Sequence, residues 1–167
     1  WAATEQAATV QALLAARLPE APLNDWLLGQ VRAGIGQVFG ATRELFIPQM
    51  INLQALGGVS FKKGCYTGQE IVARMQYLGK LKRRLYRLSL SAAQIPDIGS
   101  EIFSPVHSSA VGEVVLAASA ADTVEILAVL QQDAVTDGRL SLQSAEGPRM
   151  NLLDLPYTLD TEREIQR

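Results

Sequence analysis

The spacing of hydrophobic and polar residues changes along this chain, from helical intervals in the first half to alternation in the second. An alanine-rich stretch up to Leu18 and a stretch from 24 to 35 carry apolar residues at intervals typical of helices. Residues that start or stop helices flank these stretches: Pro19, Pro22, Asn24, Asp25, Gly34 and Gly36. The pattern therefore predicts two helices, with Asn24 or Asp25 capping the second.

A third helix is expected after a stretch that contains the only cysteine. Residues 40 to 58 show no sustained period and predict a loop with brief turns. Further on, Thr67 and Glu70 have the spacing of a capping box, in which the hydroxyl accepts a backbone amide bond and the carboxylate reaches back. The sequence thus predicts a helix that begins near Gly68.

Short apolar runs separated by turn residues follow from residue 80 onward. Tyr86, Leu88 and Leu90 alternate with polar residues, as in a strand with one buried face. The later runs are Val111–Ala117, Thr123–Leu130 and Leu140–Leu142, and the expected turn residues are Pro96, Gly99, Pro105, Gly112, Gly138 and Pro148. This spacing predicts a small antiparallel β-barrel, and we place a domain boundary between 1–79 and 80–167.

The composition fits a globular chain that can bury a core, with 48% hydrophobic residues in 167. No apolar run reaches the roughly 20 residues of a membrane-spanning helix, and the first residues lack a secretory signal. We therefore expect a cytoplasmic protein without membrane contact. A single cysteine and a single histidine cannot form an internal disulfide or a zinc site alone, so any metal is expected to be shared or absent.

Positive charge is concentrated in one part of the chain, although the net charge is -2. This part runs from residue 62 to residue 87, and its one acidic residue is Glu70. Its basic residues are Lys62, Lys63, Arg74, Lys80, Lys82, Arg83, Arg84 and Arg87. We expect one face that attracts anions. The run of Lys80, Lys82, Arg83 and Arg84 is typical of a patch that binds nucleic acid or phosphate. The alternative is a solvated strand face, whose outward cations discourage edge pairing.

Cys65 is the leading candidate for chemistry. It lies just before the predicted helix and after Lys62 and Lys63, and both the helix dipole and the lysines favour a thiolate. Gly64 and Gly68 bracket the cysteine and allow a tight backbone path that presents its side chain. The alternative is burial, because a free cysteine most often behaves as a small apolar residue.

Other candidate residues are less specific. His107 follows Pro105 in a predicted loop, so a surface role is favoured over that of a base for the thiol. Gln49 and Asn52 offer amide groups that can pair with the edge of a pterin. The aromatic residues that could line a site for a flat heteroaromatic ring are Trp26, Phe39, Phe46 and Tyr66, with core packing as the alternative.

The segment from Phe46 to Arg74 closely resembles the YgfZ family, whose hallmark is the motif K-G-C-Y-x-G-Q-E. The motif is complete here, in Lys63, Gly64, Cys65, Tyr66, Gly68, Gln69 and Glu70. The segments RAGI, VGEVV and LPYTL also resemble that family. The chain opens at Trp1 without a methionine, so together these features predict the carboxy-terminal half of a protein about twice as long.

The resemblance implies an α+β fold related to the glycine-cleavage aminomethyltransferase, with a ferredoxin-like α/β region followed by the barrel. It also implies a tetrahydrofolate site. Trp26 matches a folate-contacting tryptophan of the family, and the missing amino-terminal half would supply one wall of the site. By the same resemblance, Cys65 is the key functional residue.

The function implied by the resemblance is assembly or repair of iron-sulfur proteins, including enzymes that thiolate transfer RNA. An accessory folate-dependent factor is favoured over a catalyst, with iron-sulfur enzymes and transfer RNA as expected partners. Two alternatives stay open. One is a tetrahydrofolate-dependent aminomethyltransferase, which needs no thiol, and the other is an RNA-binding module that uses the basic strand.

Overall fold

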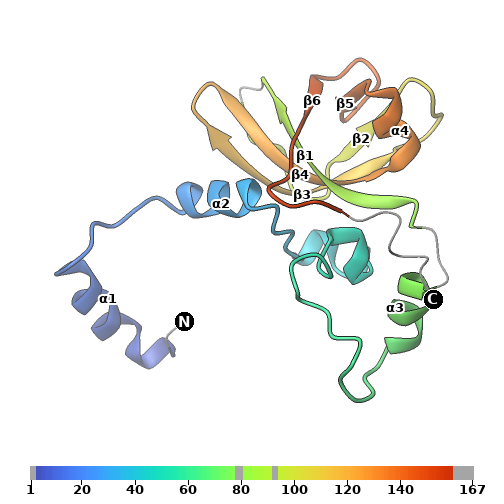
Figure 1. Ribbon diagram of the computed structural model, residues 1–167. Helices are drawn as coiled ribbons and strands as arrows, with labels where there is room; N and C mark the ends of the chain where they lie inside the picture. Colours follow the sequence, from blue (N-terminus) through green and yellow to red (C-terminus); the bar gives the residue numbers. More distant parts are fainter. Residues whose placement is uncertain (1–2, 78–80, 92–93, 160–167) are drawn as a thin grey trace.

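A closed antiparallel β-barrel forms the carboxy-terminal part of the computed structural model, which describes residues 3–77, 81–91 and 94–159 (Figure 1). Its strands are β1 Arg83–Leu90, β2 Glu101–Phe103, β3 Gly112–Ala120, β4 Thr123–Gln131, β5 Leu140–Leu142 and β6 Arg149–Leu153, with helix α4 Gln132–Asp137 after β4. They pair in the closed order β1-β4-β3-β2-β5-β6. The predicted small antiparallel barrel is therefore confirmed.

Two groups of buried residues stabilise the fold. The first fills the barrel and includes Leu88, Leu90, Ile102, Val114, Ile126, Leu140 and Met150. The second lies on the outer face of β1, β3 and β4, where Leu85, Val115 and Leu127 pack with Val31 and Ile51 from the preceding segments. Because β3 and β4 are covered on both faces, their sequences are almost continuously apolar instead of alternating.

Gly112 differs from its predicted role as a turn residue. It is the first residue of β3, and a Cβ atom there would lie 2.1 Å from the carbonyl oxygen of Val129 on β4. Glycine is needed because two strand backbones approach closely, not because the chain turns. The turn assignment of Gly112 is therefore wrong, whereas Gly99 lies in a turn with φ of +88° and Gly138 ends α4 with φ of +76°.

The two helices predicted near the start of the chain are present as α1 (Ala7–Ala15) and α2 (Leu23–Arg32), with a short 3-10 helix η1 (Thr4–Gln6) before them. The predicted cap of α2 by Asn24 or Asp25 is wrong, because the helix begins directly after Pro22. Asn24 instead exchanges two hydrogen bonds with the backbone of Ser119 at the end of β3, at 3.0 and 2.9 Å. The side chain of Asn24 therefore makes a tertiary contact and does not cap the helix.

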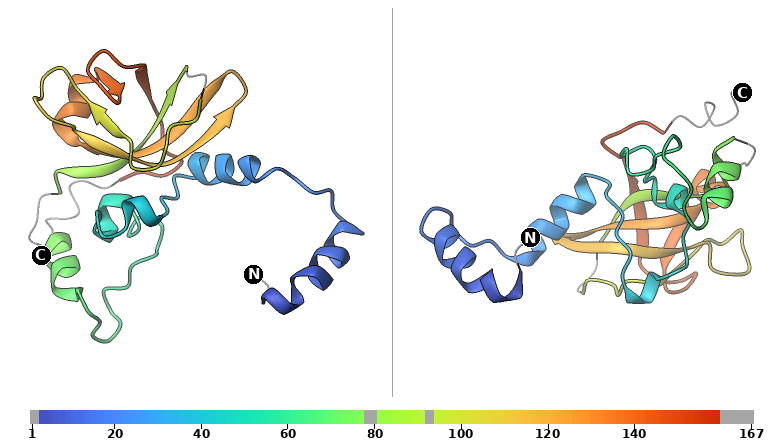
Figure 2. Two further views of the ribbon diagram at one scale, coloured as in Figure 1. Left: turned by 180° about the vertical axis from the view of Figure 1, so that it is seen from behind. Right: turned by 90° about the horizontal axis from the view of Figure 1, so that it is seen from below.

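Helix α2 ends as the sequence predicts, at a glycine. Gly34 adopts a φ of +68°, and the N–H of Ile35 donates to the carbonyl of Gln30 at 3.0 Å, which is the pattern of a Schellman ending. The chain then turns away from the barrel. Figure 2 shows α2 lying along the outer face of the barrel, while α1 extends away on a linker.

Between α2 and β1 the chain forms turns, the 3-10 helices η2 (Gly40–Thr42) and η3 (Pro48–Ile51), and helix α3 (Gln69–Tyr77). The expected loop with brief turns and the expected third helix are confirmed. The described residues before β1 contain no strand, so the mixed α+β content is present but the structure does not show a ferredoxin-like region. Val31 and Ile51, which precede the predicted domain boundary, share a core with the barrel. The boundary between 1–79 and 80–167 stays a prediction.

Candidate functional site around Cys65

Cys65 is exposed in the loop that precedes α3. The loop starts at Phe61, whose ring meets that of Tyr77 in the last turn of α3, edge to face, with centroids 5.9 Å apart. Within the loop, the ammonium of Lys63 lies over the ring of Tyr66, 4.9 Å from its centroid. The first contact attaches the start of the loop to α3, the second joins the residues on either side of the cysteine to each other, and the thiol is open to solvent.

Backbone hydrogen bonds close the turn from this loop into α3. The N–H of Gln69 donates to the carbonyl of Tyr66 at 3.1 Å, and Gly68 has a φ of +86°. The predicted capping box of Thr67 and Glu70 is wrong, since both side chains are exposed without those bonds in this described segment. Because α3 begins at Gln69, Gly68 and not Thr67 occupies the capping position.

Helix α3 is attached to the rest of the molecule through η3. Val72 is the buried residue of α3, and its carbonyl accepts a hydrogen bond of 2.6 Å from the side-chain amide of Gln49. Gln49 is only 2% exposed. The position of the cysteine loop therefore depends on an amide that lies inside the structure.

Asn52 joins η3 to two further segments. Its amide donates to the carbonyl of Leu85 on β1 at 3.0 Å and to the hydroxyl of Tyr157 at 3.4 Å. That hydroxyl donates in turn to the carbonyl of Gly34 at 2.7 Å. Burial is the first cause that raises the pKa of Tyr157, which keeps the hydroxyl a donor. The structure thus brings the RAGI and LPYTL segments together beside η3.

The residues expected to bind folate differ in how they fit such a ligand. The amides of Gln49 and Asn52 already donate to backbone carbonyls, and their oxygens are enclosed without a hydrogen-bond donor. They do not present a free edge to a pterin. Trp26 does fit, because its residue on α2 is 53% exposed and an indole can stack on a flat ring.

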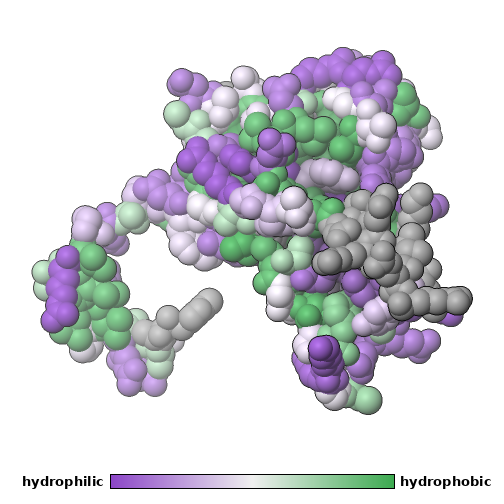
Figure 3. Space-filling model, in the orientation of Figure 1, coloured by the Kyte–Doolittle hydropathy of each residue, from purple (hydrophilic) through white to green (hydrophobic). Residues whose placement is uncertain are grey.

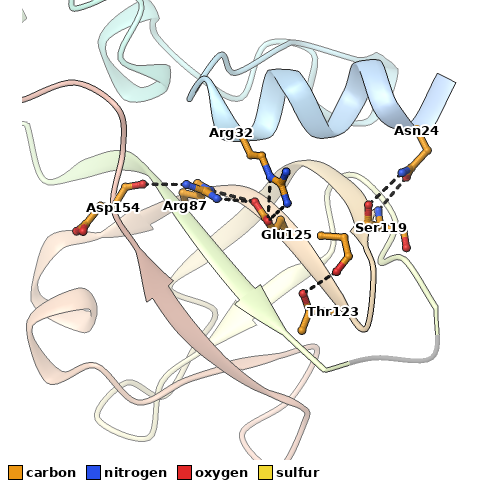
Figure 4. Close-up of polar contacts among 8 residues, drawn as sticks. Asn24, Arg32, Arg87, Ser119, Thr123, Glu125 and Asp154 are labelled. Atoms are coloured by element: carbon orange, nitrogen blue, oxygen red, sulfur yellow. Dashed lines mark hydrogen bonds and ion pairs between the residues drawn. The ribbon is translucent and has the colours of Figure 1, made fainter. Parts of the chain in front are cut away.

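A buried carboxylate ties α2 to the barrel (Figure 4). Glu125 on β4 has a side chain only 9% exposed and lies between two guanidinium groups. Arg32 from α2 donates to its Oε1 at 2.9 and 3.1 Å, and Arg87 from β1 donates to Oε2 at 2.7 and 3.1 Å. Arg87 also reaches the carbonyl of Asp154 at 3.2 Å. The network fixes the helix that carries Trp26.

The charge of Glu125 is stabilised by this arrangement. Burial alone would raise the pKa of its carboxyl, but the hydrogen bonds and positive charges of Arg32 and Arg87 together lower that pKa below its ordinary value. Glu125 is not among the site residues predicted from the sequence. A signal was present, because Glu125 is the lone charged residue in the apolar run 123–130, and buried charges are almost always paired.

The predicted basic patch does not form one exposed surface. Lys80 lies outside the described residues, and Lys82 is exposed. Arg83 forms an ion pair with Glu113 on β3. Arg84 is only 3% exposed, because its register on β1 turns it away from solvent. The interpretation of this strand as an RNA-binding face therefore loses Arg84 as a surface contact.

His107 lies in the loop after β2, as predicted, away from the cysteine loop in sequence and in contact with α4. Its Nε2 is 3.2 Å from a carboxylate oxygen of Asp133, and this hydrogen bond is the main cause that lowers the pKa of Asp133. The pair fastens the loop to α4.

Every helix in the described ranges is too short or too polar to cross a membrane.

The fold and the site together define a class of protein, namely a closed barrel with a helical outer layer and a loop that exposes a single thiol. No family model matches the chain. Curated relatives do match: it is 37% identical to the tRNA-modifying protein YgfZ of Yersinia enterocolitica over 96% of this chain and 49% of the relative. It is 38% identical to the protein of that name from Serratia proteamaculans, over 86% of this chain and 46% of the relative.

A third relative, from Yersinia pestis, is 37% identical over 96% of this chain and 49% of its own length. The chain belongs to the family of the tRNA-modifying protein YgfZ. It spans about half the length of these curated relatives and corresponds to their carboxy-terminal half.

Proposed function

We propose that this chain is the thiol-bearing, folate-binding half of an accessory protein that supports transfer-RNA modification by maintaining iron-sulfur enzymes. The observation that carries the proposal is the exposed thiol of Cys65, within a complete KGCYTGQE motif and on a loop whose first residue packs on α3. The relatives' name, tRNA-modifying protein, supports the connection to transfer RNA.

The chemistry of a single exposed cysteine favours transient contact over storage. Iron-sulfur clusters are usually held by four protein ligands, and this chain has one cysteine. In our proposal Cys65 therefore acts on the cluster or sulfur of a partner enzyme. Lys62 and Arg74 are exposed on the same segment, and their charges favour the approach of an anionic partner.

Folate has a more limited place in the proposal. Trp26 is the residue of this chain that would stack on the ligand, from a helix that the Glu125 network holds against the barrel. Gln49 and Asn52 would act indirectly, because they hold η3 against α3 and β1. Trp26 lies on α2, whereas Cys65 lies in the loop before α3, so the two residues belong to different elements.

Replacing Cys65 with serine tests the role of the thiol. The chain would be joined to the amino-terminal half of the Yersinia enterocolitica relative and expressed in cells without their own homologue. The readout is the content of sulfur-modified nucleosides in bulk transfer RNA. We expect the unchanged fusion to restore these nucleosides and Cys65→Ser to leave them at the background level, because a hydroxyl is a poor nucleophile and iron ligand at neutral pH.

Ser60→Ala is the matched control, since Ser60 is exposed directly before the same loop. This variant should restore the nucleosides as well as the unchanged protein does. Full restoration by Cys65→Ser would refute the role of the thiol and would favour the aminomethyltransferase alternative, which does not use it.

Folate binding needs its own measurement. Calorimetric titration of the same fusion with tetrahydrofolate should show saturable binding. Trp26→Ala should weaken this binding by about tenfold, the loss expected for one stacking contact. Trp26→Phe keeps an aromatic ring and should retain most of the affinity. Equal binding by the alanine variant would remove Trp26 from the site.

A further inference from the structure

The first segment of the chain, from η1 through α2, exposes an unusual amount of apolar surface. We call residues 4–32 the amino-terminal arm. Neither η1 nor α1 contains a buried residue. Leu13 is 64% exposed, Leu14 53% and Leu18 60%, and on α2 Leu23 is 69% exposed. Figure 3 shows apolar residues gathered along one side of α1.

The first helix of the arm, α1, is not stable by itself in water. Helix α1 has 9 residues, and isolated helices shorter than about 12 residues are marginal even when rich in alanine. Each large side chain left in water forgoes about 1.5 to 3 kcal/mol of burial free energy. A hollow of about 500 Å³ also runs along the helix, lined mainly by apolar residues such as Val10, Leu14 and Leu18. These features indicate a surface that is covered in the working protein.

The length of the relatives indicates what covers it. About half of the Yersinia enterocolitica relative lies outside the region that this chain matches, and the matched region is its carboxy-terminal half. The unmatched half therefore adjoins the end of the chain that carries the arm. A segment joined covalently to a surface reaches effective concentrations in the millimolar range, well above those of a second copy.

We propose that the exposed apolar side of the amino-terminal arm is the docking surface for the amino-terminal half that members of this family carry. Val10, Leu14 and Leu18 from α1, and Leu23 from α2, enter the shared core. The proposal rests on family membership and on these exposed residues. It depends neither on the thiol of Cys65 nor on folate, so it can fail or succeed independently of the proposed function.

Hydrogen exchange in two proteins tests the docking. One is the 167-residue chain, and the other is the same chain fused behind the amino-terminal half of the Yersinia enterocolitica relative. In the fusion, the amides of α1 should exchange at least about tenfold more slowly than in the chain alone, because opening then requires undocking. The amides of β3 and β4 serve as the internal reference and should change little.

Substitution separates docking from a general effect of fusion. Leu14→Asp should lower the melting temperature of the fusion by several degrees and leave that of the 167-residue chain nearly unchanged. Val106→Asp is the matched control, since Val106 is also 53% exposed but lies in the loop before β3. Its effect should be equal in the two proteins.

Three outcomes would overturn the proposal. Equal exchange of α1 in both proteins would show that the added half does not cover the arm. A 167-residue chain that is a dimer in sedimentation, and that Leu14→Asp dissociates, would assign the surface to a second copy. If the fusion is insoluble, the two halves are coexpressed as separate chains, and failure to copurify would count against docking.

Discussion

Single buried polar groups determine how the segments around the site are held. Gln49, Asn52 and Glu125 are each at least nine-tenths buried, and each bonds to a segment distant in sequence. A buried polar group that loses its partner pays the cost of desolvation, typically about 1 to 3 kcal/mol. Changes at these residues should therefore have effects that their exposed counterparts do not.

The first prediction concerns Glu125→Gln. The substitution removes the negative charge between Arg32 and Arg87 and turns an amide donor toward guanidinium groups. We expect a loss of about 1–3 kcal/mol in the free energy of unfolding, the range for hydrogen bonds to charged groups. Urea denaturation measures it. Asp137→Asn, which breaks the more exposed pair with Arg139, is the control and should cost about 0–1 kcal/mol.

The same residue predicts a pH dependence. Because the pKa of Glu125 is lowered in the folded chain, its contribution is complete above the unfolded-state pKa of roughly 4.3. That contribution is lost as the pH falls through the lower folded-state pKa. The free energy of unfolding, measured at a series of pH values from neutral to acid, should therefore decrease less steeply with falling pH for Glu125→Gln than for the unchanged chain. Parallel curves would contradict the network.

Two glycines with similar backbones allow a second test. Gly34 and Gly57 have φ of +68° and +71°, but a Cβ at Gly34 would lie 2.6 Å from the ring of Tyr157, whereas a Cβ at Gly57 meets nothing within 4 Å. Gly57→Ala should cost about 1 kcal/mol for the left-handed backbone alone. Gly34→Ala should cost a further 1 to 3 kcal/mol or so, because it separates Tyr157 from its hydrogen bonds. Equal losses in thermal unfolding would mean that the ring moves aside freely.

Among the elements, α3 depends on η3 more than on the barrel. It contributes Val72 to the buried residues and receives the bond from Gln49, while Ile71 and Tyr77 stay largely exposed. Elements with few buried contacts open locally at lower free energy than the core. Helix α3, which follows the cysteine loop, should therefore open locally at a lower free energy than the strands of the barrel.

Gln49→Leu should loosen that helix selectively. The substitution removes the bond to the carbonyl of Val72 but also removes an amide oxygen that is buried without a donor, so the free energy of unfolding should change by only about 1 kcal/mol. Amides of 69–77 should exchange faster, while those of β4 should not. Gln30→Leu on α2 is the matched control and should leave α3 unchanged. Faster exchange everywhere would indicate general destabilisation instead.

The longer elements could be predicted from sequence, whereas β2, β6 and α4 were missed and the partners of the elements could not be predicted. The alternation of Tyr86, Leu88 and Leu90 predicts β1 because the period of a strand is local information. What Asn24 bonds, why Gly112 must lack a side chain and where Arg84 lies all depend on which strand or helix packs opposite. The thiol loop was found because its glycines and lysines surround Cys65 in sequence, whereas Arg32, Arg87 and Glu125 meet only after the barrel closes.

At the scale of the whole molecule, the barrel and the amino-terminal arm differ in how complete they are. The barrel has its own interior and a covered outer face on β1, β3 and β4. The arm begins with η1 and α1, neither of which has a buried residue of its own. The barrel therefore has a formed core, whereas α1 buries nothing within the described residues, and our proposal assigns its cover to the amino-terminal half of the family.

Closure of the barrel has a consequence for the order of synthesis. Strand β1 is bonded to β4 on one side and to β6 on the other. A ribosome releases β1 long before β6, so the nascent chain carries a free strand edge until residues 149–153 have left the exit tunnel. Such edges template pairing with other chains. A premature stop or a protease cut just ahead of Arg149 would leave β1 and β5 each with an open edge that can pair with other chains.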